Sequence, residues 1–318
     1  MISILICTRD RTKSLPQTLE SIFSPTNLQE SDWELVVVYG PADSGVTRAI
    51  CEQFQQRYPD RFKFFLEKRS GKSHALNSGM EITRGEILAL TDDDVICAPD
   101  YVGSIREVFT QHPADGAQGR VLLDYEGGQP AWMGPELAAF MSQRDFGDQV
   151  FEWKDNLTGT NMIVRRHAAL SIGGFSPQIG ASAAGFMEDS EFSMRLRQSG
   201  CRFIFAPQIL VRHQLPQDRL TKSFFHARYF RWGRSEAYLR PLPASFWRTI
   251  LYTMRVTVWR SLKVLGLGIT RQRAEAFFQV CEVRREIGFA WQHWQFRRGH
   301  AAPLHSAKLD PSGNTNRS

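Results

Sequence analysis

The feature that most constrains the fold is an alternation of apolar runs of strand length with segments of helical period, which continues to about residue 212. This alternation is typical of βα units that feed a largely parallel sheet. The expected strands are Ile2–Cys7, Glu34–Tyr39, Phe62–Leu66, Ile87–Thr91, Gly119–Leu123, Asn161–Arg166, Arg202–Phe205 and Ile209–Arg212. The expected helices are Leu15–Phe23, Val46–Tyr58, His74–Ile82, Tyr101–Gln111 and Glu188–Gly200. The first four strands with their helices predict a Rossmann-like half domain, and Gly- and Trp-rich Asp124–Asp155 predicts a long loop.

The composition excludes several classes of protein. Apolar residues make up 42% and charged residues 23% of 318 residues, which excludes wholesale disorder and a collagen-like or disulfide-dense scaffold. No run of about 18 uncharged apolar residues occurs, so a polytopic membrane protein is excluded. The start, MISILICTRDR, lacks the pattern of a signal peptide, so we expect a cytoplasmic location. Five scattered cysteines, none in a CxxC pair, predict buried reduced thiols.

The charge is unevenly distributed along the chain. Arg219 to His300 carries a net charge of +12, whereas the remaining residues total −6. A basic arm of this kind fits anionic lipid headgroups, nucleic acid or an acidic polymer. Beyond Ala302 the polar tail is expected to be disordered.

The basic arm is expected to be helical. Helices are expected at Ser223–Leu239 and Phe246–Leu265, and one arc of the second carries Trp247, Ile250, Leu251, Met254, Val258, Leu262 and Leu265. Arg248, Arg255, Lys263, Tyr252 and Trp259 border this arc. The arc suits either a membrane interface or packing on the body of the protein.

Three consecutive carboxylates, Asp92, Asp93 and Asp94, follow the expected strand Ile87–Thr91. Open α/β sheets bind ligands at the carboxyl ends of their strands, and the interior of a strand does not tolerate such charge. Carboxylate oxygens suit Mg²⁺ or Mn²⁺, and the Asp-x-Asp spacing lets one carboxylate reach the metal while the other reaches a ribose hydroxyl or a bound water. The triplet therefore predicts a metal-dependent ligand site.

Several motifs in order resemble the family-two glycosyltransferases, whose GT-A fold binds nucleotide sugars. They are Ile4–Arg11, Gly71–Gly79 followed by Arg84–Leu90, the triplet Asp92–Asp94, and Gly185-Phe186-Met187-Glu188-Asp189. The resemblance covers about Met1 to Arg240. It implies a GT-A domain over 1–240, with a nucleotide-sugar half at about 1–123 and an acceptor half at about 124–240. An amphipathic helical extension over 241–302 and a tail over 303–318 complete the expected organisation.

The resemblance also implies roles for individual residues. Asp189 is the expected general base, Glu188 is expected to hold the acceptor, and the metal is expected on Asp92, Asp94 and His213. The expected donor-binding residues are Thr8, Arg9, Arg11, Asp43, Lys72, Asn77, Asp92, Asp93, Arg228, Arg231 and Trp232. Gly159 and Asn161 are expected to bind the acceptor, and Gly173-Gly174-Phe175 is expected to form a structural turn.

One position departs from the family pattern. The acidic residue that usually follows the second strand and holds uracil is replaced by Tyr39 or Gly40. Asp43, later in the same loop, either compensates or caps the helix that follows, and Tyr39 offers a ring that stacks on the base.

These features predict an inverting glycosyltransferase that moves a sugar from a nucleotide-diphosphate donor, expected to be a UDP-sugar, to a glycan or lipid-linked acceptor in cell-surface polysaccharide synthesis. The expected cofactor is Mn²⁺ or Mg²⁺, and the expected location is the inner face of the plasma membrane, on an anionic surface. No nucleic-acid partner is expected. A Mg-dependent nucleotidyltransferase, or a polyanion-binding protein acting through the basic arm, remains an alternative.

Overall fold

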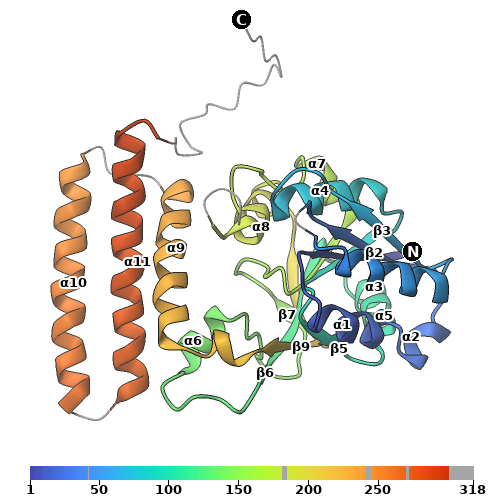
Figure 1. The fold of residues 1–318 in the computed structure, drawn as a ribbon, viewed down its shortest axis with the longest axis horizontal. Helices are drawn as coiled ribbons and strands as arrows, with labels where there is room; N and C mark the ends of the chain where they lie inside the picture. The colour runs from blue at the N-terminus through green and yellow to red at the C-terminus, as the bar shows by residue number, and fades with distance from the viewer. Residues whose placement is uncertain (42, 181–184, 241–244, 270–271, 301–318) are drawn as a thin grey trace, which may run out of the picture. The chain divides into compact units, whose positions relative to one another are not determined.

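The computed structural model describes residues 1–41, 43–180, 185–240, 245–269 and 272–300. They form two compact units, which we describe separately: unit 1 holds Met1–Pro177 with Glu188–Thr221, and unit 2 holds Gln178–Met187 with the chain from Lys222 onward (Figure 1). The sequence-based boundary near residue 240 falls after α9 (Lys222–Leu239), whereas the second unit includes this helix. The tail 303–318, expected to be disordered, lies outside the described residues.

Unit 1 is built on a nine-stranded sheet with the order β3-β2-β1-β4-β8-β6-β9-β5, and β7 pairs with β9. The strands are β1 (Ile2–Thr8), β2 (Trp33–Tyr39), β3 (Phe62–Leu66), β4 (Ile87–Thr91), β5 (Val95–Cys97), β6 (Gly116–Tyr125), β7 (Phe151–Glu152), β8 (Asn161–Arg165) and β9 (Phe203–Leu215). β3, β2, β1 and β4 are parallel, whereas β8 runs antiparallel to both β4 and β6. The carboxyl ends of β1 and β4 therefore meet at one edge of the sheet.

Helices cover both faces of this sheet. They are α1 (Ser14–Ile22), α2 (Pro25–Gln29), α3 (Val46–Arg57), α4 (Lys72–Ile82), α5 (Tyr101–Gln111), α6 (Pro135–Phe140), α7 (Arg166–Ser171) and α8 (Glu188–Gln198). Apolar side chains of α1, α3 and α5 form one core with Ile4 and Ile6 of β1, and those of α4, α7 and α8 form a second core with Leu5. Because neighbouring side chains of a strand point to opposite faces, one apolar run supplies both cores. The expected α/β architecture is confirmed.

The structure corrects the expected elements in the second half of unit 1. The two short strands expected at Arg202–Phe205 and Ile209–Arg212 are one strand, β9, whose pairing with β6 shifts register between Gly119 and Arg120. Pro207 lacks an N–H for a hydrogen bond between strands. It lies in the unpaired segment at this register shift, beyond which β9 continues. The expected loop Asp124–Asp155 contains α6 and β7, and α2, β5 and α7 were not anticipated.

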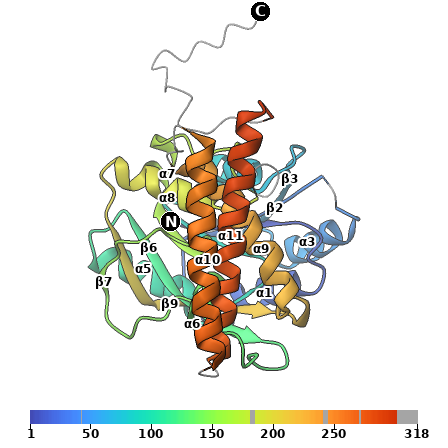
Figure 2. The same cartoon turned by 90° about the vertical axis from the view of Figure 1, so that its left-hand side faces the viewer.

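Unit 2 contains three long helices, α9, α10 (Phe246–Ile269) and α11 (Arg273–Arg297), with α11 packed against both of the others (Figures 1 and 2). α9 and α11 approach closely at two glycines. A Cβ atom on Gly233 would overlap the carbonyl oxygen of Arg285, and one on Gly288 would overlap that of Phe230. No helix in the described part of the chain is long and apolar enough to cross a membrane.

All five cysteines are free thiols, as expected. Burial is confirmed for Cys51, Cys97 and Cys281 but is wrong for Cys7 and Cys201, which are only partly buried.

Replacing either crossing glycine is expected to destabilise unit 2. Gly233→Ala and Gly288→Ala each place a methyl group against backbone, which cannot rotate away, so we expect a loss of about 2–3 kcal/mol in the free energy of unfolding. Gly266→Ala in α10 is the matched control, because nothing lies within 4 Å of its added Cβ. Urea unfolding followed by circular dichroism tests this; equal midpoints for all three variants would contradict the close crossing.

Candidate functional site

The candidate site lies at the edge of the sheet where β1 and β4 end. Thr8 is the last residue of β1, and Asp92, Asp93 and Asp94 connect β4 to β5. Asp93 and Asp94 are almost entirely buried, and the Thr8 side chain is buried beside Asp93. Buried carboxylates need cations or hydrogen-bond donors, so the neighbours of each one indicate its role.

Lys72, the first residue of α4, joins two carboxylates that are far apart in the sequence. Its Nζ lies 2.8 Å from Asp92 Oδ1 and 3.7 Å from Glu188 Oε1. Burial alone would lower the pKa of Lys72, but the charges of Asp92 and Glu188 raise it well above its usual value. Burial would likewise raise the pKa of Asp92, yet Lys72 lowers it, whereas burial keeps the pKa of Glu188 raised. Lys72 is therefore a fixed cation between the two acidic motifs.

Of the three carboxylates of the triplet, Asp93 lies farthest from a positively charged partner. Its nearest cation is Arg11, with Nε 3.9 Å from Oδ1. Burial and the charge of Asp94 raise the pKa of Asp93 to about 7. This carboxylate therefore has the capacity to accept a hydrogen bond from a ligand hydroxyl.

Asp94 contacts two residues from the end of unit 1. Arg219 Nη1 lies 2.9 Å from Oδ2, and His213 Nε2 lies 3.4 Å from Oδ1. Although burial opposes them, His213 and Arg219 hold the pKa of Asp94 well below its usual range. Antiparallel pairing of β5 with β9 sets Val95 opposite His213, which brings the imidazole to the triplet.

The orientation of His213 suits a metal ligand. Nδ1 lies 3.0 Å from the carbonyl oxygen of Met141, and a carbonyl can only accept, so Nδ1 carries a proton. In the neutral imidazole, Nε2 then presents a lone pair toward the Asp94 carboxylate. Two acceptors at this distance require a proton or a cation between them.

The three predicted metal ligands do not form one cluster. Within the described residues, no group of three or more His, Cys, Asp or Glu side chains is arranged to hold a metal ion. Asp92 accepts from Lys72 Nζ through Oδ1 and from Thr160 Oγ1 at 2.9 Å through Oδ2, so its assignment as a metal ligand is not supported. Asp94 and His213 fit Mn²⁺ or Mg²⁺ as two ligands of a set that phosphate oxygens would complete.

Asp189 is oriented by backbone donors at the beginning of α8. Its Oδ2 accepts from the N–H of Gly159 at 3.0 Å, and its Oδ1 accepts from the N–H of Ser190 at 2.7 Å. Oδ1 also accepts from the Ser190 hydroxyl at 3.4 Å, so Oδ2 is the oxygen that keeps a lone pair for the proton of a ligand hydroxyl group. Gly159, predicted to bind the acceptor, therefore lies directly beside the predicted base.

Two predicted ligand-binding amides have structural roles. Asn161 is fully buried, donates to the carbonyls of Arg120 and Ile209, and accepts from the hydroxyl of Tyr101. Asn77 donates to the Phe175 carbonyl and accepts from its N–H, both at 2.8 Å, and so fixes the Gly-Gly-Phe turn. The fully buried Asn161 is not available to a sugar, which corrects that prediction, whereas the partly buried Asn77 keeps one N–H and one lone pair and its predicted role stays a prediction.

A hydrogen bond joins the loop after β1 to the loop after β2. Asp10, at a φ of 51°, accepts through Oδ1 from the N–H of Ser44 at 3.1 Å. Asp43 accepts from the N–H groups of Thr47 and Arg48, so of its two predicted roles the structure shows the cap of α3. Arg9 is exposed beside Asp10.

The predicted donor-binding residues Arg228, Arg231 and Trp232 all lie in α9 of unit 2. The Arg228 guanidinium lies 4.4 Å from the centre of the Phe186 ring, and Arg285 lies 4.8 Å from that of Trp232. Arg231 is exposed. These contacts are internal to unit 2 and assign no ligand.

Sequence analysis missed three residues of the site. Thr160 bonds Asp92, and Arg219, counted with the basic arm, belongs to unit 1 and bonds Asp94. Burial lowers the pKa of Arg144, whereas the charges of Asp189 and Asp155 act to raise it. Thr160 lies between the predicted residues Gly159 and Asn161, in the turn that precedes β8; no sequence signal identified the two arginines.

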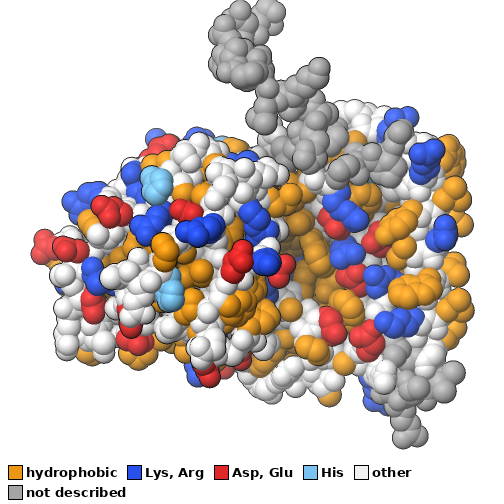
Figure 3. Space-filling view, turned by 180° about the vertical axis from the view of Figure 1, so that it is seen from behind, with side chains coloured by type: hydrophobic (Ala, Val, Ile, Leu, Met, Phe, Trp, Pro, Cys, Tyr) orange, Lys and Arg blue, Asp and Glu red, His pale blue; other side chains and the backbone are white. Residues whose placement is uncertain are grey.

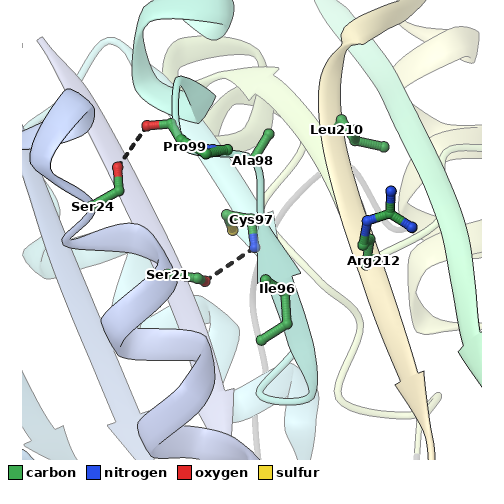
Figure 4. Close-up of a pocket in the computed structure, with 8 residues that line it drawn as sticks. All are labelled: Ser21, Ser24, Ile96, Cys97, Ala98, Pro99, Leu210 and Arg212. Atoms are coloured by element: carbon green, nitrogen blue, oxygen red, sulfur yellow. Dashed lines mark hydrogen bonds between the residues drawn. The ribbon is translucent and has the colours of Figure 1, made fainter.

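A separate hollow of about 410 Å³ lies beside β5 (Figure 4). It is lined by Ser21, Ser24, Ile96, Cys97, Ala98, Pro99, Leu210 and Arg212. Ser21 Oγ accepts from the N–H of Cys97, and Ser24 donates to the carbonyl of Pro99. This hollow contains none of the carboxylates of the candidate site and is assigned no function.

Comparisons with known proteins identify the family and the fold. The model of the family described as Glycosyl transferase family 2 matches residues 3–173. The glucosyl-dolichyl phosphate glucuronosyltransferase of Haloferax volcanii is 25% identical over 243 residues, which cover 74% of this chain and 76% of the relative. Succinoglycan biosynthesis protein ExoM of Rhizobium meliloti is 25% identical over 243 residues, covering 75% of this chain and 74% of its own.

Solved structures also resemble this chain. The mannosyltransferase PcManGT from Pyrobaculum calidifontis, solved in complex with GDP-Man and Mn²⁺, matches with a TM-score of 0.63 and 17% identity. The match covers 92% of this chain and 87% of that protein. The likeness confirms the expected GT-A fold.

Removing the bridging cation is expected to give a pH-dependent loss of stability. Lys72→Met leaves Asp92 and Glu188 without their shared partner, and we expect it to lower the free energy of unfolding by about 2 kcal/mol at neutral pH. The pKa of both carboxylates should rise in the folded variant, so the folded state should bind more protons than the unfolded state. The deficit relative to wild type should therefore shrink as the pH falls from neutral toward the ordinary carboxyl range.

Lys68→Met is the matched control, since Lys68 is exposed in the loop that precedes α4. Thermal unfolding across this pH interval makes the measurement. A Lys72→Met deficit that stays constant with pH would rule out the bridge as the cause.

Proposed function

This chain belongs to glycosyl transferase family 2, and on that premise we propose that it is an inverting enzyme that transfers a sugar from a nucleotide-diphosphate donor to a hydroxyl of a glycan or lipid-linked acceptor. Family membership makes the protein a glycosyltransferase and favours sugar transfer over the nucleotidyltransferase and polyanion-binding alternatives. One observation carries the proposal: Lys72 bridges Asp92 and Glu188, and so links the triplet after β4 to the acidic pair that begins α8.

The donor is proposed to bind along the triplet. Thr8 ends β1, and Arg11 follows it in the next loop, beside Asp93. The raised pKa of Asp93 suits a hydrogen bond between this side chain and a ribose hydroxyl. Arg9 and Asp43 are the proposed contacts of the nucleotide in the joined β1 and β2 loops. The proposal keeps a UDP-sugar as the donor.

A divalent cation is proposed on Asp94 and His213. When bound, it would neutralise the negative charge of the nucleoside diphosphate leaving group. The neighbouring Arg219 adds a fixed positive charge, and the Met141 carbonyl holds the imidazole in the tautomer that leaves Nε2 available. The Mn²⁺ in the structural relative supports this assignment.

Asp189 is proposed to act as the general base. As the acceptor oxygen bonds to the anomeric carbon, its proton passes to a carboxylate oxygen of Asp189, and the bond from that carbon to the diphosphate oxygen breaks with its electron pair. The N–H groups of Gly159 and Ser190 fix the carboxylate during this transfer. Glu188, held by Lys72, is placed to hydrogen-bond the acceptor.

The relatives guide the choice of acceptor and location. One relative is named for transfer to a glucosyl-dolichyl phosphate and another for succinoglycan biosynthesis, which supports a lipid-linked glycan acceptor in cell-surface polysaccharide synthesis. We place the reaction on the cytoplasmic side, with the enzyme attached peripherally at the inner face of the membrane.

Replacing the base is expected to abolish turnover without abolishing donor binding. Asp189→Asn keeps the size of the side chain but cannot take the acceptor proton, so we expect turnover to fall by at least about a hundredfold. Isothermal titration with the donor should give an affinity close to that of wild type. Asp60→Asn, at an exposed position, is the control, and near-normal turnover by the Asp189 variant would disprove the assignment.

Nucleotide binding is expected to depend on the cation. In a thermal-shift panel of UDP, GDP, CDP and ADP, with Mn²⁺ or with EDTA, one nucleotide should stabilise the protein, by about 2.7 kcal/mol at about a hundred times its Kd. The shift should vanish in EDTA and in Asp94→Asn, and should persist in Asp60→Asn. Selective stabilisation by UDP supports the proposed donor class, whereas stabilisation that EDTA leaves intact counts against the metal.

A further inference from the structure

The outer face of α10 carries a continuous apolar stripe. Its six side chains are Trp247, Leu251, Met254, Val258, Leu262 and Leu265. Each is between 59% and 72% exposed, far more than ordinary surface leucines or valines of this protein. The spacing of three or four residues keeps them on one side of the helix over about 27 Å. Figure 3 shows hydrophobic side chains over the C-terminal helices, interspersed with Lys and Arg.

The opposite face of α10 is the one that packs, and polar side chains on it bond α11. The hydroxyl of buried Thr249 lies 2.7 Å from His293 Nδ1 of α11. Arg260 donates to Gln279 at 2.5 Å and to Glu282 at 3.0 Å, both on α11. The packed face therefore mixes polar and apolar side chains, and the strongest apolar stripe of the helix is exposed, whereas an ordinary surface helix buries its apolar stripe. Six of the seven members of the arc predicted from the sequence are exposed, and Ile250 is partly buried.

The charge around the stripe identifies its partner. α10 contains no Asp or Glu, and Arg248 and Arg255 are exposed along one edge of the stripe, with Tyr252 and Trp259 beside them. A second copy docked through this face would bring arginines together, which is unfavourable. An anionic lipid surface offers phosphates to the arginines and acyl chains to the stripe, and aromatic side chains favour the boundary between the two.

We propose that the outer face of α10 is a membrane-docking surface that lies in the plane of an anionic phospholipid leaflet. The apolar stripe enters the boundary between headgroups and acyl chains, and Arg248 and Arg255 bind lipid phosphates. The proposal concerns unit 2 alone and does not depend on the sugar transfer proposed above.

Vesicle co-sedimentation of the full chain tests the proposal. The vesicles are phosphatidylcholine alone, or phosphatidylcholine with about one third phosphatidylglycerol. Wild type should bind the anionic vesicles at least tenfold more tightly than the neutral ones. Leu251→Gln/Val258→Gln/Leu262→Gln should lose at least tenfold in binding to anionic vesicles, and Arg248→Gln/Arg255→Gln should lose the preference for anionic lipid.

The matched control is Val46→Gln/Phe65→Gln/Leu170→Gln, which alters exposed apolar side chains of unit 1 and should bind vesicles like wild type. Because the substituted side chains are exposed, circular dichroism should show every variant folded. The proposal fails if wild type does not sediment with anionic vesicles, or if the triple α10 variant binds as tightly as wild type. It also fails if sedimentation velocity finds a wild-type dimer that the triple variant dissolves while neither protein binds vesicles.

Discussion

The site depends on positively charged side chains that balance the negative charges of carboxylates. The sheet brings these carboxylates together where β1 and β4 end. Parallel β1 and β4 end side by side, and the triplet that follows β4 places negative charges where water is largely excluded. Each carboxylate has a different partner: Lys72 for Asp92, Arg11 at a longer distance for Asp93, and Arg219 with His213 for Asp94. The differing compensation separates their pKa values and gives neighbouring residues of one type distinct chemistry.

The mixed half of the sheet supplies the rest of the site. β8 lies next to β4, so Gly159 and Thr160, which precede β8, approach Asp189 and Asp92. β9 pairs with β5 and carries His213 to the triplet. The irregularity in the pairing of β6 and β9 lets a strand that contains Pro207 continue far enough to do so. The parallel half therefore positions the triplet, and the mixed half positions the groups around it.

Different contacts hold the helices of unit 2 together. α9 and α11 cross where two glycines allow backbone contact, and α10 joins α11 through a buried polar network. Thr249 and Arg260 on the inner side of α10 bond side chains of α11, and the apolar side chains of the stripe are exposed. Such an arrangement is favourable only when another apolar phase covers the stripe.

The sequence by itself determined the class of fold, the parallel strands and the acidic motifs, because strand-length apolar runs and charges at strand ends are local patterns. The tertiary structure decided which residues meet. Lys72 and Glu188 are more than a hundred residues apart, and only the packed sheet brings them within 3.7 Å. Thr160 and Asn161 are adjacent and both buried, but Thr160 bonds Asp92, whereas Asn161, the residue predicted from the sequence, bonds Tyr101 and backbone carbonyls. The helical period of the sequence showed which apolar residues of α10 share one face. Whether that face is packed or exposed depended on the side chains of α11, because only a packed neighbour determines this.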